Sequence, residues 1–368
     1  MEPNNKYTIL VADDTAEIRE ILSVILKPDY QVKIAATGTE ALEIANDMDT
    51  PDLILLDVMM PGMDGFETCR KLKENEGTKD IPVIFLTASI EAKNEEMGLT
   101  LGAVDYVSKP FSPALLIARV RNHLELKSNR DNLERLVQNR TEELNQTQDA
   151  TIEAIASLAE YRDPETGGHI RRTQTYVRTL AEYLKDHSNF SQFLNDESIL
   201  MLYKSAPLHD IGKVGVPDHI LLKPGKLTDE EFEEMKKHAV YGRDTLLSAE
   251  ARLGGSSFLS IARQLTESHH EKWDGSGYPY GLKGDAIPIP GRLMALADVY
   301  DALISKRVYK EPFSHEKAIE IICKGKGKHF DPDIVDAFLA CSQAFREIAI
   351  EFSDYMEERE NLINVANM

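Results

Sequence analysis

Two pairs of adjacent side chains stand out because packing explains them poorly. His209 and Asp210 are neighbours in the run His-Asp-Ile-Gly-Lys that ends at Lys213, and His269 and His270 are neighbours further along the chain. An imidazole nitrogen beside a carboxylate oxygen suits a metal ion of intermediate hardness. Hydrolysis assisted by a bound metal is therefore the first chemistry to expect.

Further imidazoles and carboxylates accompany these pairs. The candidate metal ligands are five histidines and three acids, namely Glu165, His169, His209, Asp210, His238, His269, His270 and Asp298. Nitrogen and oxygen ligands without thiolate suit Fe or Mn, and less often Zn or Ni. Taken singly, each could be a core histidine, a surface acid or a helix cap. Eight ligands exceed what one ion can bind, so we expect two or three ions, with Asp210 able to bridge two of them.

The expected chemistry is attack on a phosphate. Two ions roughly 3.5–4 Å apart can share a hydroxide nucleophile and hold a phosphoryl oxygen. Lys213 could offset the charge that develops on the phosphate. Arg307 and Lys310 are local cations that could bind the phosphate of a substrate, although a solvated basic helix end is the simpler interpretation of either one.

The first part of the chain alternates short apolar segments with helical ones. We expect strands at 8–12, 52–56, 81–86 and 104–107, and helices at 15–26, 39–48, 65–74 and 92–101. This alternation is typical of a doubly wound parallel sheet, in which functional groups gather at the carboxyl ends of the strands. Those ends carry Asp13, Asp14, Asp57, Thr87 and Lys109.

Three carboxylates at one sheet edge repel each other unless a divalent cation lies between them, and Mg²⁺ fits that requirement. Asp57 could then attack a phosphoryl donor, while Lys109 neutralises charge and Thr87 holds the new phosphate. The alternative, in which the aspartates only cap the following helices, explains one of them but not the whole set.

These positions resemble a two-component receiver domain over residues 1–125. The resemblance is carried by Asp13-Asp14, Asp57, the run Met60-Pro61-Gly62-Met63-Asp64-Gly65, Thr87-Ala88 and Lys109-Pro110-Phe111. It implies a flavodoxin-like fold and phosphorylation of Asp57 by a cognate sensor histidine kinase. It also implies Mg²⁺ held by Asp13, Asp14, Asp57 and the Met59 carbonyl, with Thr87, Tyr106 and Lys109 as the switch residues.

A long helix is expected to follow. Residues 114–163 contain neither proline nor glycine, and a helix over that range would be about 75 Å long. Heptad spacing places Leu126 and Leu133 at one seam position, and Val137, Leu144 and Leu158 at the other. Polar residues interrupt both, so we expect a weak coiled coil over 126–150 that joins a homodimer. The alternative is a solvated spacer.

From about residue 151 to 368, helical periodicity predicts an all-α domain. Its motifs resemble the HD-GYP subgroup of the HD phosphohydrolase superfamily over roughly residues 150–345. The resemblance is carried by Glu165 and His169, His209 to Lys213, Pro217-Asp218, Lys223 to Leu227, His238, His269 to Glu271, Gly277-Tyr278-Pro279 and Asp298 to Asp301.

This second resemblance implies hydrolysis of cyclic di-GMP to pGpG, and in some members to GMP, by two or three Fe or Mn ions. The eight candidate ligands match those of the subgroup, and Glu165 is the one associated with a third ion. The loop at Tyr278 is expected to shape the substrate site and to contact partners such as diguanylate cyclase domains.

Composition excludes several other classes of function. A chain of 368 residues favours two or more domains, and a net charge of −20 argues against a nucleic-acid polymer as partner. Its three cysteines form no pair typical of a metal or disulfide framework. No apolar run is long enough to cross a membrane and no signal-peptide segment is recognisable, so we expect a cytoplasmic protein without a membrane partner.

The expected function is that of a response regulator whose output domain hydrolyses cyclic di-GMP under the control of Asp57. Two alternatives remain open. The protein could be a cyclic di-GMP-binding signalling adaptor with little or no catalysis, or a phosphohydrolase that prefers pGpG.

Overall fold

The computed structural model describes residues 6–88, 96, 98–160, 168–253, 258–306, 311–353 and 355–363. The chain divides into two compact units, Met1–Glu142 and Glu143–Met368. No helix within the described ranges combines the length and apolarity needed to traverse a bilayer.

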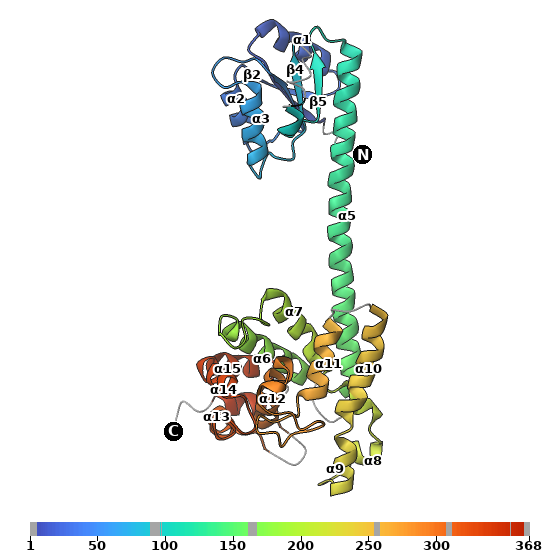
Figure 1. Ribbon diagram of the computed structural model, residues 1–368, viewed down its shortest axis with the longest axis vertical. Coiled ribbons are helices and arrows are strands. Elements are labelled where there is room, and N and C mark those ends of the chain that lie inside the picture. Colours follow the sequence, from blue (N-terminus) through green and yellow to red (C-terminus); the bar gives the residue numbers. More distant parts are fainter. Residues whose placement is uncertain are drawn as a thin grey trace. The chain divides into compact units, whose positions relative to one another are not determined.

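A five-stranded parallel sheet forms the centre of the first unit (Figure 1). Its strands are β1 (Thr8–Ala12), β2 (Gln31–Ala35), β3 (Leu53–Asp57), β4 (Val83–Thr87) and β5 (Asp105–Ser108). Their order is β2-β1-β3-β4-β5. The crossovers include α1 (Ala16–Leu26), α2 (Gly38–Ala45) and α3 (Gly65–Glu74). This arrangement confirms the expected doubly wound fold.

Alternate residues of the strands belong to two separate hydrophobic cores, one on each face of the sheet. Ile9 and Val11 pack with residues of α1 and of α5 (Pro113–Glu160), whereas Leu10 and Ala12 pack with residues of α2 and α3. Because both faces are covered, the polar groups that follow each strand are left at its carboxyl end, where a site can form.

Two expectations about this unit need comment. Strand β2 was not predicted, because its run Gln31-Val32-Lys33-Ile34-Ala35 is partly polar. It lies at the edge of the sheet, where such side chains remain in contact with water. The expected helix at 92–101 falls partly outside the described residues.

Helix α5 begins in the first unit and ends in the second, which confirms a long connecting helix. In the first unit, Leu116, Val120 and Leu124 are buried against the sheet. In the second, Ile152 is buried against Leu208, Leu246 and neighbouring residues. One helix therefore contributes to the packing of both units.

Helices build the described part of the second unit (Figure 1). The α-helices are α6 (Gly168–Leu184), α7 (Asp196–Ser205), α8 (Asp218–Leu221), α9 (Asp229–Met235), α10 (His238–Leu253), α11 (Phe258–Ser268), α12 (Ile289–Ile304), α13 (His315–Lys324), α14 (Pro332–Ala340), α15 (Ser342–Glu351) and α16 (Met356–Ile363). The 3₁₀ helices are η1 (Ala206–Leu208), η2 (Ile211–Gly215) and η3 (Gly284–Ala286).

An aromatic cluster holds α6 against α12 and α15. The Tyr176 ring stacks on Phe345 with centroids 4.4 Å apart, and its edge meets Tyr300 at 5.2 Å. All three side chains are fully buried. Rings of this size contribute strongly to a core, so the middle of α6 and the last turns of α12 are fixed relative to each other.

Candidate metal centres and phosphoacceptor

The first candidate site lies at the carboxyl end of the parallel sheet. Asp57 is the last residue of β3, and Asp13 directly follows β1. The Lys109 ammonium lies 2.7 Å from Asp13 Oδ2 and 2.9 Å from Asp57 Oδ1. Burial opposes the charge on Lys109, but its bonds to these two carboxylates outweigh that effect and raise its pKa.

Asp13, Asp14 and Asp57 each bring a carboxylate oxygen within 4.8 Å of the others. Oxygen ligands at this spacing fit Mg²⁺. Burial raises the pKa of Asp57, against the influence of Lys109, and the Met59 backbone N–H donates to its carboxylate. The donor set therefore suits a hard cation beside a nucleophilic carboxylate.

The remaining predicted receiver residues lie on adjacent strands. Thr87 is the last residue of β4 and is largely buried. Tyr106 lies in β5, and its ring is 5.2 Å from that of Phe85. Their roles as a switch stay a prediction.

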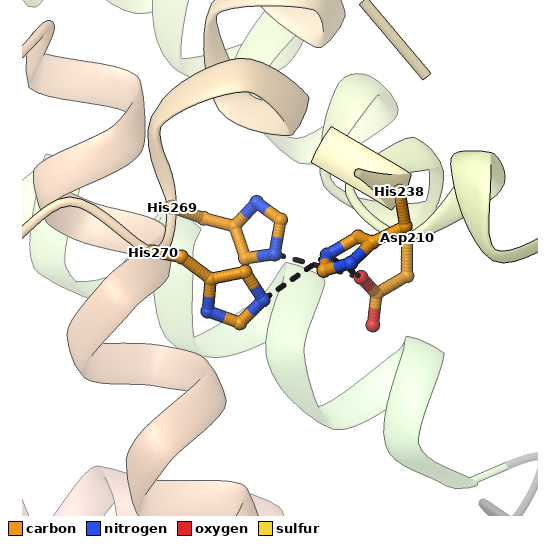
Figure 2. A group of neighbouring side chains, drawn as sticks. All are labelled: Asp210, His238, His269 and His270. Atoms are coloured by element: carbon orange, nitrogen blue, oxygen red, sulfur yellow. Dashed lines mark hydrogen bonds and ion pairs between the residues drawn. The ribbon is translucent and has the colours of Figure 1, made fainter. Parts of the chain in front are cut away.

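The second unit brings seven of the eight candidate metal ligands into two groups. One consists of Asp210, His238, His269 and His270, and the other of His169, His209 and Asp298. We name them the Asp210 group and the His169 group. In the Asp210 group the side chains point toward one another from η2, α10 and the end of α11 (Figure 2).

Asp210 faces both groups. Its Oδ1 lies 3.3 Å from His238 Nε2 and 3.5 Å from His269 Nε2, while its Oδ2 lies 3.4 Å from His209 Nε2. Within the His169 group, His169 Nε2 lies 3.5 Å from His209 Nε2. A carboxylate with one oxygen toward each group is the arrangement that bridging between two ions requires.

The outer nitrogens of four histidines fix their tautomers. The Nδ1 atoms of His209, His238 and His269 face the carbonyls of Ala206, Met235 and Leu265 at 2.9, 2.7 and 3.1 Å. His169 Nδ1 faces Asp301 Oδ2 at 2.9 Å. Because each Nδ1 has an acceptor it carries the proton, so each neutral ring directs the lone pair of Nε2 inward.

The surroundings of two buried atoms are direct evidence for a metal site. Asp210 Oδ1 and His269 Nε2 have no hydrogen-bond partner within the described part of the chain. An unpaired buried acceptor is costly, and a cation between these atoms would relieve the cost. The residues present therefore fit metal binding, with the nitrogen and oxygen ligands that the sequence predicts.

Local sequence explains how His209 and Asp210 reach this position. Pro207 cannot donate a backbone hydrogen bond, and α7 gives way there to the tight turn η1. Gly212 follows, and a Cβ at that position would lie 1.9 Å from the His238 carbonyl oxygen. Only glycine allows η2 to approach α10 this closely, so Gly212 brings Asp210 near His238.

The protonation states differ between the histidines. Burial lowers the pKa of His238 to about 4, although Asp210 opposes this, and burial also lowers the pKa of His270 well below its usual value. Burial acts on His209 too, but Asp210 beside it raises the pKa overall. The lowered pKa values of His238 and His270 favour their neutral, metal-binding forms, whereas the carboxylate beside His209 makes protonation of that ring easier.

Lys213, predicted to be catalytic, and Tyr278, predicted to bind substrate, border the Asp210 group. Lys213 Nζ lies 2.7 Å from Asp210 Oδ2, one turn further along η2. The Tyr278 ring stacks on His270 with centroids 4.7 Å apart. The Glu271 carboxylate accepts the backbone N–H groups of Tyr280 and Leu282 at 2.7 and 2.9 Å, and so holds the loop that carries Tyr278.

Sequence reasoning gave no role to Glu271, Arg172 or Asp301. Each is almost completely buried and lies beside a candidate ligand. The available signals were weak: Glu271 follows His270, and Asp301 is three residues after Asp298 on the same helix face. Glu165, Arg307 and Lys310, by contrast, lie outside the described residues, and their expected roles stay predictions.

Comparison with known proteins agrees with the domain predicted for each half of the chain. Residues 9–121 match the response regulator receiver domain, and residues 133–334, more than half of the chain, match the HD domain. The chain therefore belongs to the HD domain family and carries a receiver domain ahead of its HD domain. These matches confirm the pairing that the motifs predicted.

Two relatives match this chain over most of their own length, and a third matches it over part of its own. A Vibrio cholerae protein named probable cyclic di-GMP phosphodiesterase is 50% identical over 362 residues, which cover 96% of this chain and 82% of that protein. The cyclic di-GMP phosphodiesterase response regulator RpfG of Xanthomonas campestris is 34% identical over 94% of this chain and 90% of its own. The 3'3'-cGAMP-specific phosphodiesterase 2 of Vibrio cholerae is 40% identical over 58% of this chain and 38% of its own.

Metal retention should depend on pH differently at the two groups. The raised pKa of His209 means that protons compete with metal at the His169 group as the pH falls, while the depressed pKa values of His238 and His270 protect the Asp210 group. Dialysis of Mn²⁺-loaded protein at decreasing pH should therefore release metal in two steps.

The first step should disappear when the His169 group is removed by His209→Gln. The exposed His219, in the short helix α8, provides a control as His219→Gln, which should keep both steps. Release of all metal in one step by the native chain would contradict the assignment.

Proposed function

We propose that the protein is a cyclic di-GMP phosphodiesterase controlled by phosphorylation of Asp57. The observation that carries the catalytic part is the position of Asp210, which faces two groups of inward-pointing imidazoles with its two oxygens. The relatives that share both domains carry names with the same activity.

In this proposal the Asp210 group and the His169 group each hold one Fe or Mn ion, and Glu165 is the ligand of a third ion in chains that bind three. The ions, when bound, activate water and polarise a phosphoryl oxygen of the substrate. Asp210 and the four oriented imidazoles keep their ligand atoms in place, which avoids reorganisation during the reaction.

The chain's own cations act on the substrate. Lys213, held beside Asp210, offsets negative charge on the phosphate that is being cleaved. Arg307 and Lys310 bind the second phosphate of the cyclic dinucleotide, and the Tyr278 ring offers a flat surface to a base. The product is pGpG, with further cleavage to GMP.

Phosphorylation acts through α5 in this proposal. In the first unit, Arg119 and His123 of α5 bond to Asp105 of β5, next to Tyr106. In the second unit, Asp149 of α5 pairs with Lys204 at 2.8 Å, and Glu153 pairs with Arg171 of α6 at 3.1 Å. Because α6 also carries His169, a shift of α5 would reach a metal ligand.

The partners follow from these assignments. A cognate sensor histidine kinase supplies the phosphoryl group to Asp57 in the cytoplasm, and the loop around Tyr278 contacts diguanylate cyclase domains. The connecting helix pairs two copies of the chain. Its support is a row of leucine and valine side chains at heptad spacing, of which Leu133, Val137 and Leu144 are 62%, 64% and 70% exposed.

Loss of the ligands should abolish turnover. His209→Ala or Asp210→Ala removes a ligand of the His169 group or the shared carboxylate, and cyclic di-GMP consumption should fall at least about 1000-fold. Chromatography of the products, together with metal analysis of each variant, measures this outcome. Lys185→Ala is the control, because this lysine pairs with Asp196 and follows α6 at the end opposite His169.

The same assay separates the alternatives. A cyclic di-GMP-binding adaptor would bind the nucleotide without multiple turnovers, even when fully loaded with metal. Competition between cyclic di-GMP, pGpG and 3'3'-cGAMP identifies the preferred substrate, and the relative specific for 3'3'-cGAMP is the reason to include that nucleotide. Preference for either competitor would overturn the proposed substrate.

Phosphorylation should require Asp57 and should change the rate of cyclic di-GMP hydrolysis. Acetyl phosphate in the presence of Mg²⁺ should label the native chain but not Asp57→Asn. Asp52→Asn is a matched control, because Asp52 precedes the same strand at its opposite end and accepts the Thr8 backbone N–H. Labelling of Asp57→Asn, or an unchanged rate after phosphorylation, would count against the proposal.

The dimer has its own test by analytical ultracentrifugation. Replacement of two seam residues, Leu133→Glu and Leu144→Glu, should convert a dimer to a monomer, because like charges would face each other across the seam. Gln138→Glu adds a charge to the exposed side of the same helix, away from the seam, and should leave the dimer intact. A native chain that sediments as a monomer would contradict the pairing.

A further inference from the structure

His169 differs from the other oriented histidines in the group that accepts its Nδ1 proton. His209, His238 and His269 donate to neutral backbone carbonyls of their own segments. His169 donates instead to the Asp301 carboxylate, at 2.9 Å, across the contact between α6 and α12. A carboxylate partner makes an imidazole a stronger electron donor than a carbonyl does.

Arg172 holds that carboxylate in place. Its Nε lies 2.6 Å from Asp301 Oδ1 and its second terminal nitrogen lies 3.0 Å from Asp301 Oδ2, so the pair is bidentate. Both side chains are 1% exposed. Arg172 also donates to the Ser305 hydroxyl at 3.0 Å and to the Phe352 carbonyl at 2.8 Å. Asp301 is thus a fixed, buried anion with few alternative positions.

Helix periodicity builds this arrangement in two layers. His169 and Arg172 are three residues apart on α6, and Asp298 and Asp301 are three residues apart on α12, so each pair shares a helix face. The inner layer contains the candidate ligands His169 and Asp298. The outer layer contains Asp301, which contacts His169, and Arg172, which binds Asp301. Neither residue belongs to a metal group.

We propose that Asp301 is a positioning residue that sets the metal affinity of the His169 group, whereas in the Asp210 group His238 and His269 are oriented by backbone carbonyls. This inference rests on the proposed metal-dependent function and adds a difference between the two groups. Removing the Asp301 charge therefore weakens the binding of the metal ion at the His169 group and leaves binding at the Asp210 group unchanged.

The test is a metal titration of Asp301→Asn, which keeps the size of the side chain and removes its charge. Apo protein is titrated with Mn²⁺, and free Mn²⁺ is counted by electron paramagnetic resonance. One apparent dissociation constant should rise by about 10–100-fold, while the other keeps its native value. The constant that stays should be the one lost in His270→Ala, since His270 belongs to the Asp210 group.

Asp331→Asn is the matched control for loss of a buried ion pair. Asp331 is 4% exposed and pairs with Arg292 at 2.8 Å, and it belongs to neither metal group among the described residues. The Asp331→Asn variant should unfold at a lower temperature than the native chain, without a change in either Mn²⁺ dissociation constant. Asp301→Glu restores the charge, so it should recover part of the lost affinity, and it serves as the test if Asp301→Asn does not fold.

Two failures can be told apart. If the native chain binds two ions and Asp301→Asn binds both with native constants, the positioning role is wrong and the proposed function stands. If the native chain binds no Mn²⁺ at all, the metal-dependent function itself is wrong, and the role of Asp301 falls with it.

Discussion

The arrangement of the second unit depends on the repulsion between the inward-facing lone pairs around the Asp210 carboxylate. His209, His238 and His269 direct their Nε2 atoms toward that carboxylate at 3.3–3.5 Å, inside a largely buried region. Buried acceptors that face one another repel, and a folded chain tolerates them only with a cation or protons between them. In the metal-free chain, the Asp210 carboxylate raises the pKa of His209, so that protonation of this ring would reduce the repulsion.

The surrounding architecture serves to hold this arrangement. Pro207 and Gly212 shape the tight turns on either side of His209 and Asp210, and the Thr266 hydroxyl donates to the Leu208 carbonyl, which ties those turns to α11. The aromatic cluster around Tyr176 fixes α6 against α12. Each ligand therefore comes from an element that is anchored by packing or by backbone hydrogen bonds.

The sequence was sufficient for the fold class and for the choice of candidate ligands. Strand-end aspartates and histidine-carboxylate pairs are unusual combinations, so they could be recognised without coordinates. The grouping of the ligands could not be predicted, because it depends on the close contact of η2 with α10 that Gly212 permits. Asp301 was missed for a similar reason, since only the contact between α6 and α12 brings it to His169. Strand β2 was not predicted because an edge strand tolerates polar residues such as Gln31 and Lys33, which weaken the apolar pattern of a strand.

Anomalous X-ray diffraction from crystals of the Mn²⁺-loaded protein tests the central claim most directly, because it locates metal without reference to activity. Our account predicts one anomalous peak among Asp210, His238, His269 and His270, and a second among His169, His209 and Asp298, with the Asp210 carboxylate in contact with both. A single peak, or peaks that lie away from these side chains, would contradict it.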